Sequence, residues 1–147
     1  MTEEDIAQVQ ALWKEYWETL GLPLEFQGFG EQLRRLPSEF AAPAGLLLLA
    51  FNDGVAAGTV AVRPLRTDAC EVKRLYVPKH FRGKGLGKKL LSVVIEQARL
   101  IGYQAMYADT LLTMHDAARL YEQFGFERVA AYSPDPTPGA IYLRLAL

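Results

Sequence analysis

The sequence has little cysteine and little net charge: its 147 residues contain one cysteine and carry a net charge of −1. Because Cys70 has no second thiol to pair with, an intramolecular disulfide is excluded, which fits a reducing cytosol. The near-neutral charge argues against a broad nucleic-acid-binding surface. Any basic function must therefore be local, as in the stretch from Lys79 to Lys89.

Long hydrophobic runs are also missing. No segment approaches the roughly 18 uninterrupted apolar residues of a membrane span, and the N-terminus reads EEDIAQ rather than a basic, apolar signal. Half of the residues are nevertheless hydrophobic, which excludes the disordered class. The length suits one domain over residues 1–147, and we expect it in the cytoplasm, with no membrane or nucleic-acid partner.

The first half of the chain changes from a helical to a strand-like apolar period. Apolar residues at helical spacing predict helices over 3–20 and around 29–36, followed by a loop over 37–45. Two apolar runs, 45–51 and 55–65, flank the turn Asn52-Asp53-Gly54 and predict a hairpin. A third strand over 70–77, ended by Pro78, completes an antiparallel meander.

The second half alternates strands and helices. We expect a helix over 86–100 closed by Gly102, then a strand over 103–109, so that a crossover gives one parallel strand pair. Thr113 and Asp116 have capping-box spacing for a helix that runs to Phe124, with Gly125 as its cap. Two last strands, 126–132 and 139–147, flank a proline-rich loop at 134–138. The elements predict one mixed α+β fold.

The stretch FRGKGLGKK, residues 81–89, has three glycines between cationic side chains immediately before a helix. Glycines let backbone N–H groups converge on an anion, and a helix start adds free N–H groups and a positive dipole end. The spacing fits neither a P-loop nor a dinucleotide fingerprint, since Arg82, Lys88 and Leu90 occupy positions that require glycine. A phosphate cradle and a solvated basic turn both remain open.

Three segments together resemble the GNAT superfamily of N-acetyltransferases. Arg82-x-x-Gly85-x-Gly87 matches the family's acyl-CoA signature, and residues 71–78 (EVKRLYVP) look like the strand that leads into it. Residues 120–126 (LYEQFGF) look like the family's LYExxGF segment. The resemblance covers roughly residues 45–147 and implies the GNAT fold: a mostly antiparallel sheet with a splayed parallel strand pair, flanked by helices.

The resemblance implies acetyl-CoA as cofactor and places its binding on a defined set of residues. The pyrophosphate would rest on the loop, and the pantetheine arm would run along the preceding strand. Two departures from the family are a first strand that is absent or very short, since the chain starts almost directly in a helix, and Met114 where members often have an asparagine, a contact that His115 could replace. The implied cofactor-binding residues are Leu75, Tyr76, Val77, Arg82, Gly83, Lys84, Gly85, Leu86, Gly87, Lys88 and His115.

The same resemblance implies the catalytic groups. Tyr121 matches the family tyrosine that protonates the leaving thiolate, although it also belongs to a helical apolar stripe typical of a core. An ammonium acceptor must lose a proton before it attacks. Glu71 is the first candidate for that base and Asp109 the second. The alternative for Glu71 is a solvent-facing carboxylate paired with Arg63 or Lys73.

The sequence therefore predicts an acetyl-CoA-dependent N-acetyltransferase that acts by direct transfer in a ternary complex. The aromatic residues of the acceptor side favour a small amine with an apolar portion, although Trp13, Tyr16 and Trp17 also have the spacing of core residues. A non-catalytic acyl-CoA sensor and a protein lysine or N-terminal acetyltransferase are the alternatives. We expect no metal, Cys70 as a small buried residue, and a monomer or homodimer.

Overall fold

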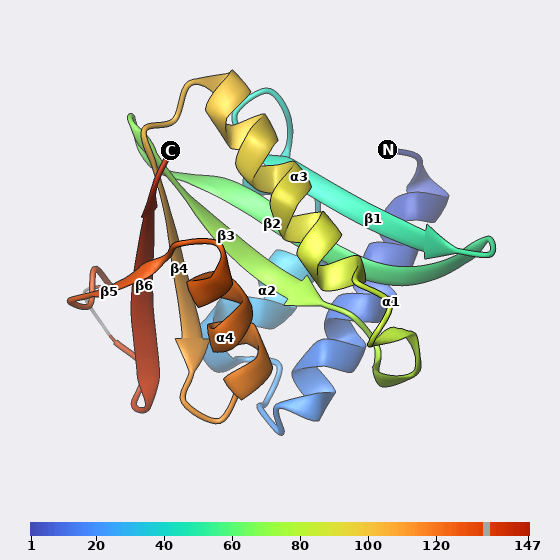
Figure 1. Ribbon diagram of the computed structural model, residues 1–147. Helices are drawn as coiled ribbons and strands as arrows, with labels where there is room; N and C mark the ends of the chain where they lie inside the picture. Colours follow the sequence, from blue (N-terminus) through green and yellow to red (C-terminus); the bar gives the residue numbers. More distant parts are fainter. Residues whose placement is uncertain (134–135) are drawn as a thin grey trace.

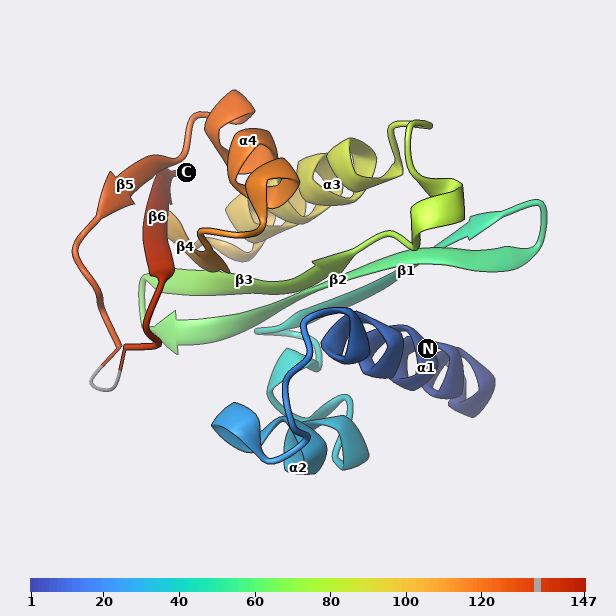
Figure 2. The same cartoon turned by 90° about the horizontal axis from the view of Figure 1, so that it is seen from below.

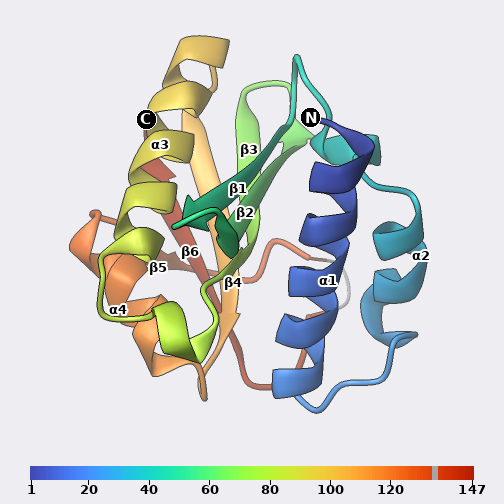
Figure 3. The same ribbon diagram turned by 90° about the vertical axis from the view of Figure 1, so that its right-hand side faces the viewer.

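The computed structural model describes residues 1–133 and 136–147 and has a six-stranded sheet between two helical layers (Figures 1 and 2). In sheet order the strands are β1 (Leu46–Asn52), β2 (Val55–Arg66), β3 (Ala69–Tyr76), β4 (Ala105–Leu111), β6 (Ala140–Ala146) and β5 (Glu127–Val129). Helices α3 (Leu86–Ile101) and α4 (His115–Gln123) cover one face, and α1 (Glu3–Thr19) and α2 (Phe29–Arg34) cover the other (Figure 3).

The strand pairing confirms the expected mixed α+β class. Strands β1, β2 and β3 form the antiparallel meander, and α3 carries the chain across to β4, which pairs with β3 in parallel. Strand β6 lies between β4 and β5 and is antiparallel to both. Among the described residues the first element is α1. The β1–β2 turn has positive φ at Asp53 (51°) and Gly54 (79°), which suits the hairpin twist.

Several predicted boundaries were wrong. Strand β4 begins and ends two residues later than expected, and β5 covers only Glu127–Val129 of the expected 126–132. Because β4 extends to Leu111 and a turn follows, α4 starts at His115 with Met114 as its N-cap and no side-chain cap, so Thr113 and Asp116 form no capping box. The capping box belongs to α1, between Thr2 and Asp5. Of the expected loop at 134–138, residues 134 and 135 lie outside the described residues.

Each face of the sheet has its own apolar core. Under α3 and α4 the buried side chains include Leu143 and the buried face of α3, which consists of Leu90, Leu91, Val94, Ile95 and Ala98. Under α1 and α2 an aromatic cluster contains Trp13, which is fully buried, together with Val9, Trp17, Phe29, Phe40 and Ala61. Cys70 is also fully buried, as expected for a small apolar residue, and burial raises the pKa of its thiol to about 12.

The parallel pair separates along its length. Strands β3 and β4 pair only from Ala69–Ala105 to Val72–Ala108. Immediately beyond, the β2–β3 register shifts by a bulge, where Arg74 has a φ of 58°. From there the two strands diverge toward their C-terminal ends (Figure 1). This splay, expected from the family resemblance, opens the sheet where the candidate site lies.

Candidate active site

A groove of about 610 Å³ runs from the glycine-rich loop to the gap between β3 and β4, and we call it the glycine-loop groove. Its walls come from the end of α1, the end of β3, the loop, and the first turns of α3 and α4. The side chains of Lys84 and Lys88 are exposed and do not line it. The other expected cofactor-binding residues do: Leu75, Tyr76, Val77, Arg82, Gly83, Gly85, Leu86, Gly87 and His115.

The loop has the backbone geometry of an anion site. Gly83 and Gly85 have φ values of 83° and 78°, which favour glycine, and Gly85 is the N-cap of α3. Gly85 provides no side-chain cap, so the first N–H groups of the 16-residue helix have no intrahelical acceptor. The Nε of Arg82 donates to the carbonyl oxygen of Val77 at 2.8 Å, which ties the loop to the end of β3.

The edge of β3 that faces β4 is open beyond Val72. In the described part of the chain, β3 pairs with β4 only as far as Val72, whereas its other edge stays paired with β2 up to Tyr76. Backbone N–H and C=O groups from Lys73 onward therefore face the gap between the strands. An extended ligand placed along this edge would find hydrogen-bonding groups at strand spacing.

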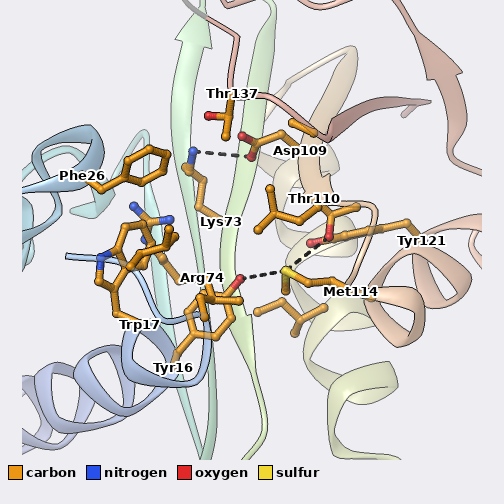
Figure 4. A pocket seen from close by; sticks show the side chains of 16 residues that line it. Tyr16, Trp17, Phe26, Lys73, Arg74, Asp109, Thr110, Met114, Tyr121 and Thr137 are labelled. Carbon is orange, nitrogen blue, oxygen red and sulfur yellow. Dashed lines mark hydrogen bonds and ion pairs between the residues drawn. The ribbon is translucent and has the colours of Figure 1, made fainter. Parts of the chain in front are cut away.

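A second, smaller pocket of about 60 Å³ lies where the groove reaches the gap, and we call it the junction pocket (Figure 4). It shares Tyr16, Leu75 and Met114 with the groove. Tyr121 lines it from α4, is 4% exposed, and packs its ring 5.1 Å from that of Phe126. Burial raises the pKa of Tyr121, so its hydroxyl is protonated at neutral pH. Tyr121 is therefore a core residue that also lines a cavity.

Asp109 lines the same junction pocket from β4. Its Oδ1 lies 3.5 Å from the Nζ of Lys73, and burial lowers the pKa of that lysine while Asp109 and Glu71 oppose the shift. Met114 lies between α1 and β4, because the hydroxyls of Tyr16 on α1 and Thr110 on β4 both donate to its sulfur at 3.7 Å. Burial also raises the pKa of Tyr16 to about 12. The junction pocket therefore holds one carboxylate beside protonated hydroxyls.

Glu71 lies elsewhere. It lines a third cavity of about 360 Å³, the charged pocket, and not the junction pocket that contains Tyr121. Its Oε1 accepts from Arg63 at 2.9 Å and lies 3.8 Å from Lys73 Nζ, and its Oε2 accepts from the hydroxyl of Tyr132. The pairing with Arg63 and Lys73 foreseen as the alternative is thus present. The carboxylate is buried, however, at 3% exposure rather than solvent-facing.

Three lining residues were not assigned to the site from the sequence: Tyr16, Lys73 and Arg74. Lys73 and Arg74 line both the junction pocket and the charged pocket. The sequence contained a signal for Lys73 and Arg74. Side chains alternate between the two faces of a strand, and both faces of a central strand are covered by helices. Two consecutive cations on such a strand must therefore both point into the protein. Tyr16 gave no such signal, because its spacing on α1 is that of a core residue.

Among residues 1–133 and 136–147, no helix has the length and apolarity to cross a membrane. The same described residues contain no group of three or more His, Cys, Asp and Glu side chains placed to hold a metal ion.

Known proteins resemble the chain over nearly its full length. An uncharacterised N-acetyltransferase of Schizosaccharomyces pombe is 36% identical over 146 residues, which cover 98% of this chain and 90% of the relative. The N-acetylaspartate synthetase of Danio rerio is 38% identical over 92 residues, which cover 62% of this chain but only 33% of that protein.

Solved structures have the same fold. A GNAT-family acetyltransferase of Staphylococcus aureus superimposes with a TM-score of 0.84 at 18% identity, over 99% of this chain and 95% of that one. A putative acetyltransferase of Salmonella typhimurium, solved with its cofactor acetyl-CoA, has a TM-score of 0.59 at 27% identity, over 68% of this chain and 63% of that one. The sequence pattern of the acetyltransferase (GNAT) family matches residues 7–126. The chain therefore belongs to the acetyltransferase (GNAT) family, which uses acetyl-CoA.

Proposed function

We propose that this protein transfers an acetyl group from acetyl-CoA to the primary amine of a small molecule, directly and within a ternary complex. One observation carries the proposal: the glycine-loop groove ends at the junction pocket, which Tyr121 and Asp109 both line. The candidate cofactor site therefore adjoins the two candidate proton-transfer groups, because the groove and the pocket share lining residues.

The groove fits the cofactor's two parts. The positive-φ glycines and the free N–H groups of α3 suit a pyrophosphate, and the open edge of β3 suits the amide-bearing pantetheine arm. At Gly87 a Cβ would lie 3.6 Å from Leu120 and 3.8 Å from Val77, so glycine leaves the floor of the groove free at that point. Bound acetyl-CoA supplies an activated thioester, and its carbonyl would be polarised by a backbone N–H of β3.

Tyr121 acts as the general acid in this proposal. Its hydroxyl makes no hydrogen bond with any described residue, although the side chain is buried and lines the junction pocket. Since its raised pKa keeps the proton in place at neutral pH, the hydroxyl can donate to a sulfur that develops negative charge.

Asp109 is better placed than Glu71 to accept the amine's proton. Both oxygens of Glu71 already accept from Arg63 and Tyr132, and Glu71 lies outside the junction pocket. Asp109 lines that pocket together with Tyr121, and the only described ion pair of its carboxylate, with Lys73, is long at 3.5 Å. We therefore assign the base to Asp109, acting directly or through water, and a supporting ion-pair role to Glu71.

The acceptor is a small molecule in this proposal because the junction pocket is small and walled. It is lined by Trp17, Leu20, Leu22 and Phe26 on the side of α1, and about 60 Å³ accommodates only a few non-hydrogen atoms. The name of the Danio rerio relative, N-acetylaspartate synthetase, also indicates a small acetylated product for that protein. A flexible lysine from a protein substrate would have to enter through the same narrow passage.

Calorimetric titration with acetyl-CoA, followed by CoA release across a panel of amines, tests the proposal. We expect stoichiometric binding, and release of CoA that matches an acetylated product seen by mass spectrometry. Binding without release for any amine would favour the sensor alternative, and acetylation of peptides alone would favour the protein-modifying one. Absence of acetyl-CoA binding would overturn the proposal entirely.

A further inference from the structure

Arg74 brings a positive charge into the wall of the junction pocket without a carboxylate to neutralise it. Its only hydrogen bond with a described residue runs from Nη2 to the neutral Oε1 of Gln32 at 2.8 Å. Its Nε is buried and has no described partner. None of the ion pairs among residues 1–133 and 136–147 involves Arg74.

Aromatic rings hold the guanidinium in place. Its Cζ lies 4.9 Å from the ring centre of Trp17, 5.2 Å from that of Phe29 and 5.7 Å from that of Trp13. Rings offer a cation some stabilisation, but they leave its N–H donors unsatisfied. Burial accordingly lowers the pKa of Arg74. The arrangement fixes a planar set of donors in a nearly dry wall, which is the form in which arginine binds carboxylates most selectively.

The backbone is shaped to direct this residue. Arg74 occupies the bulge where β3 leaves β4, and its φ of 58° is a left-handed conformation that is unfavourable for a residue with a Cβ. The residue at this position is arginine and not glycine, so the backbone strain remains. A strained non-glycine residue that the surrounding packing holds in place is typical of a functional position.

The charges that line the junction pocket do not balance. Its charged residues are Lys73, Arg74 and Asp109. Lys73 pairs with Asp109, so the charge of Arg74 is left over. An anion that entered the pocket would neutralise the charge of Arg74 and accept hydrogen bonds from the free donors of its guanidinium.

We propose that the acceptor is an amino acid, a small molecule with a carboxylate beside its primary amine, and that Arg74 binds that carboxylate. The inference rests on the proposed acetyltransferase function and names its substrate class. Arg74 and Asp109 line the same small pocket, so the carboxylate and the amine it orients must be only a few bonds apart. In the reaction the ammonium group gives one proton to Asp109, and the neutral amine forms the C–N bond to the thioester carbonyl. As the C–S bond breaks, Tyr121 protonates the sulfur and takes up the second proton that leaves the nitrogen. The products are an N-acetylamino acid and CoA, and Asp109 releases its proton to solvent.

The test compares matched small acceptors that differ only in the carboxylate: alanine, alaninamide and ethylamine, with the corresponding glycine and β-alanine series. We expect kcat/KM for the acid to exceed that for its partners by about 10- to 100-fold. The carboxamide has the more acidic ammonium group, so a preference for the acid cannot come from amine ionisation. Equal rates for acids and decarboxylated amines would overturn the inference while leaving the acetyltransferase function intact.

Variants locate the effect at Arg74. R74Q should raise KM for the acids about 10- to 100-fold and leave both the KM for ethylamine and the affinity for acetyl-CoA unchanged, whereas R74K should fall between the two. R128Q makes the same chemical change at an exposed position of β5 that lines neither the groove nor the junction pocket, and it should change nothing. A KM for the acids that R74Q left unaltered would refute the assignment.

A binding measurement keeps the test independent of turnover and of the variant's folding. The unmodified protein, saturated with CoA, is titrated calorimetrically with alanine and with ethylamine. We expect the acid to bind at least about 10-fold more tightly. If acetyl-CoA binds but no acid binds or reacts, the carboxylate site is refuted alone; if acetyl-CoA itself does not bind, the proposed function fails first and the inference fails with it.

Discussion

The Nζ of Lys73 lies 3.5 Å from the Oδ1 of Asp109, and this pair spans the gap between β3 and β4 just where the two strands separate. Both residues line the junction pocket and the charged pocket, so the pair forms part of the wall between them (Figure 4). A substitution of either residue therefore changes both cavities. Because Asp109 lines both pockets and Glu71 lines the charged pocket but not the junction pocket, substituting each carboxylate in turn tests which of them is the base.

Asp109 and Glu71 should respond differently to neutralisation. D109N should lower kcat by about 100-fold or more, because the group that accepts the amine's proton is lost. E71Q should leave kcat nearly unchanged and act on stability, since it removes a buried partner of Arg63. Steady-state rates across pH and thermal unfolding of both variants separate the two. A larger catalytic loss in E71Q than in D109N would return the base to Glu71.

Removing the hydroxyl of Tyr121 should affect chemistry and not folding. Y121F keeps the ring contact with Phe126 and should lower kcat by about 100-fold or more, with little change in acetyl-CoA affinity. Y103F is the matched control, since that buried hydroxyl donates to the carbonyl of Ala44 and lines neither the groove nor the junction pocket. The control should lose a little stability and no activity. Full turnover by Y121F would exclude the general-acid role.

The glycine loop can be tested with two positions of equal backbone geometry. Gly85 and Gly54 have φ values of 78° and 79°, and a Cβ at either position would meet no atom within 4 Å. G85E places a carboxylate at the start of α3 and should weaken acetyl-CoA binding on the order of 100-fold, whereas G54E adds the same charge and backbone strain in the β1–β2 turn. Calorimetry should show unchanged affinity for G54E. Equal affinity of the two variants would argue against a pyrophosphate site on the loop.

Cys70 should take no part in acetyl transfer. Its thiol is buried, and a pKa raised to about 12 keeps it protonated at neutral pH. Ellman's reagent should therefore modify the native protein very slowly, and react once per chain after denaturation. C70A should retain kcat, and acetyl-CoA without acceptor should leave no acetylated protein. An acetylated Cys70 in a peptide digest would indicate a covalent route instead of direct transfer.

Stability should fall in alkaline solution. The pKa of Tyr16 rises from 10.0 to about 12 on folding, and that of Tyr121 also rises, with burial the main cause in both. Because the tyrosine pKa is higher in the folded state than in the unfolded state, the full stability is present below pH 10. Above pH 10 the unfolded chain loses these protons while the folded chain keeps them. Each tyrosine then removes about 1.4 kcal/mol per pH unit from the free energy of unfolding. Urea unfolding between pH 9 and about pH 12 measures the slope, which Y121F should reduce; an unchanged slope would show that Tyr121 ionises freely in the folded state.

Local pattern accounts for the parts of the site that are continuous in sequence. The end of β3, the glycine loop and the start of α3 follow one another from Leu75 to Gly87, and they line one groove. The charged partners could not be found in this way, because Glu71 meets Tyr132 and Arg74 meets Gln32 only after the sheet and α2 have packed. The bulge that turns Arg74 inward is a product of the same packing. Nor could spacing on α1 distinguish Tyr16, which lines the pocket, from Trp13, which is core.

The limited pairing of β3 with β4 has an energetic consequence for ligand entry. The two strands are joined only from Ala69 to Val72, and past that point they already stand apart. A ligand that enters the gap therefore breaks no hydrogen bond between strands and waits for no rearrangement of the sheet. The free energy needed to hold the strands open is met during folding, by the apolar cores on the two faces, so that binding energy remains available for holding and orienting the reactants.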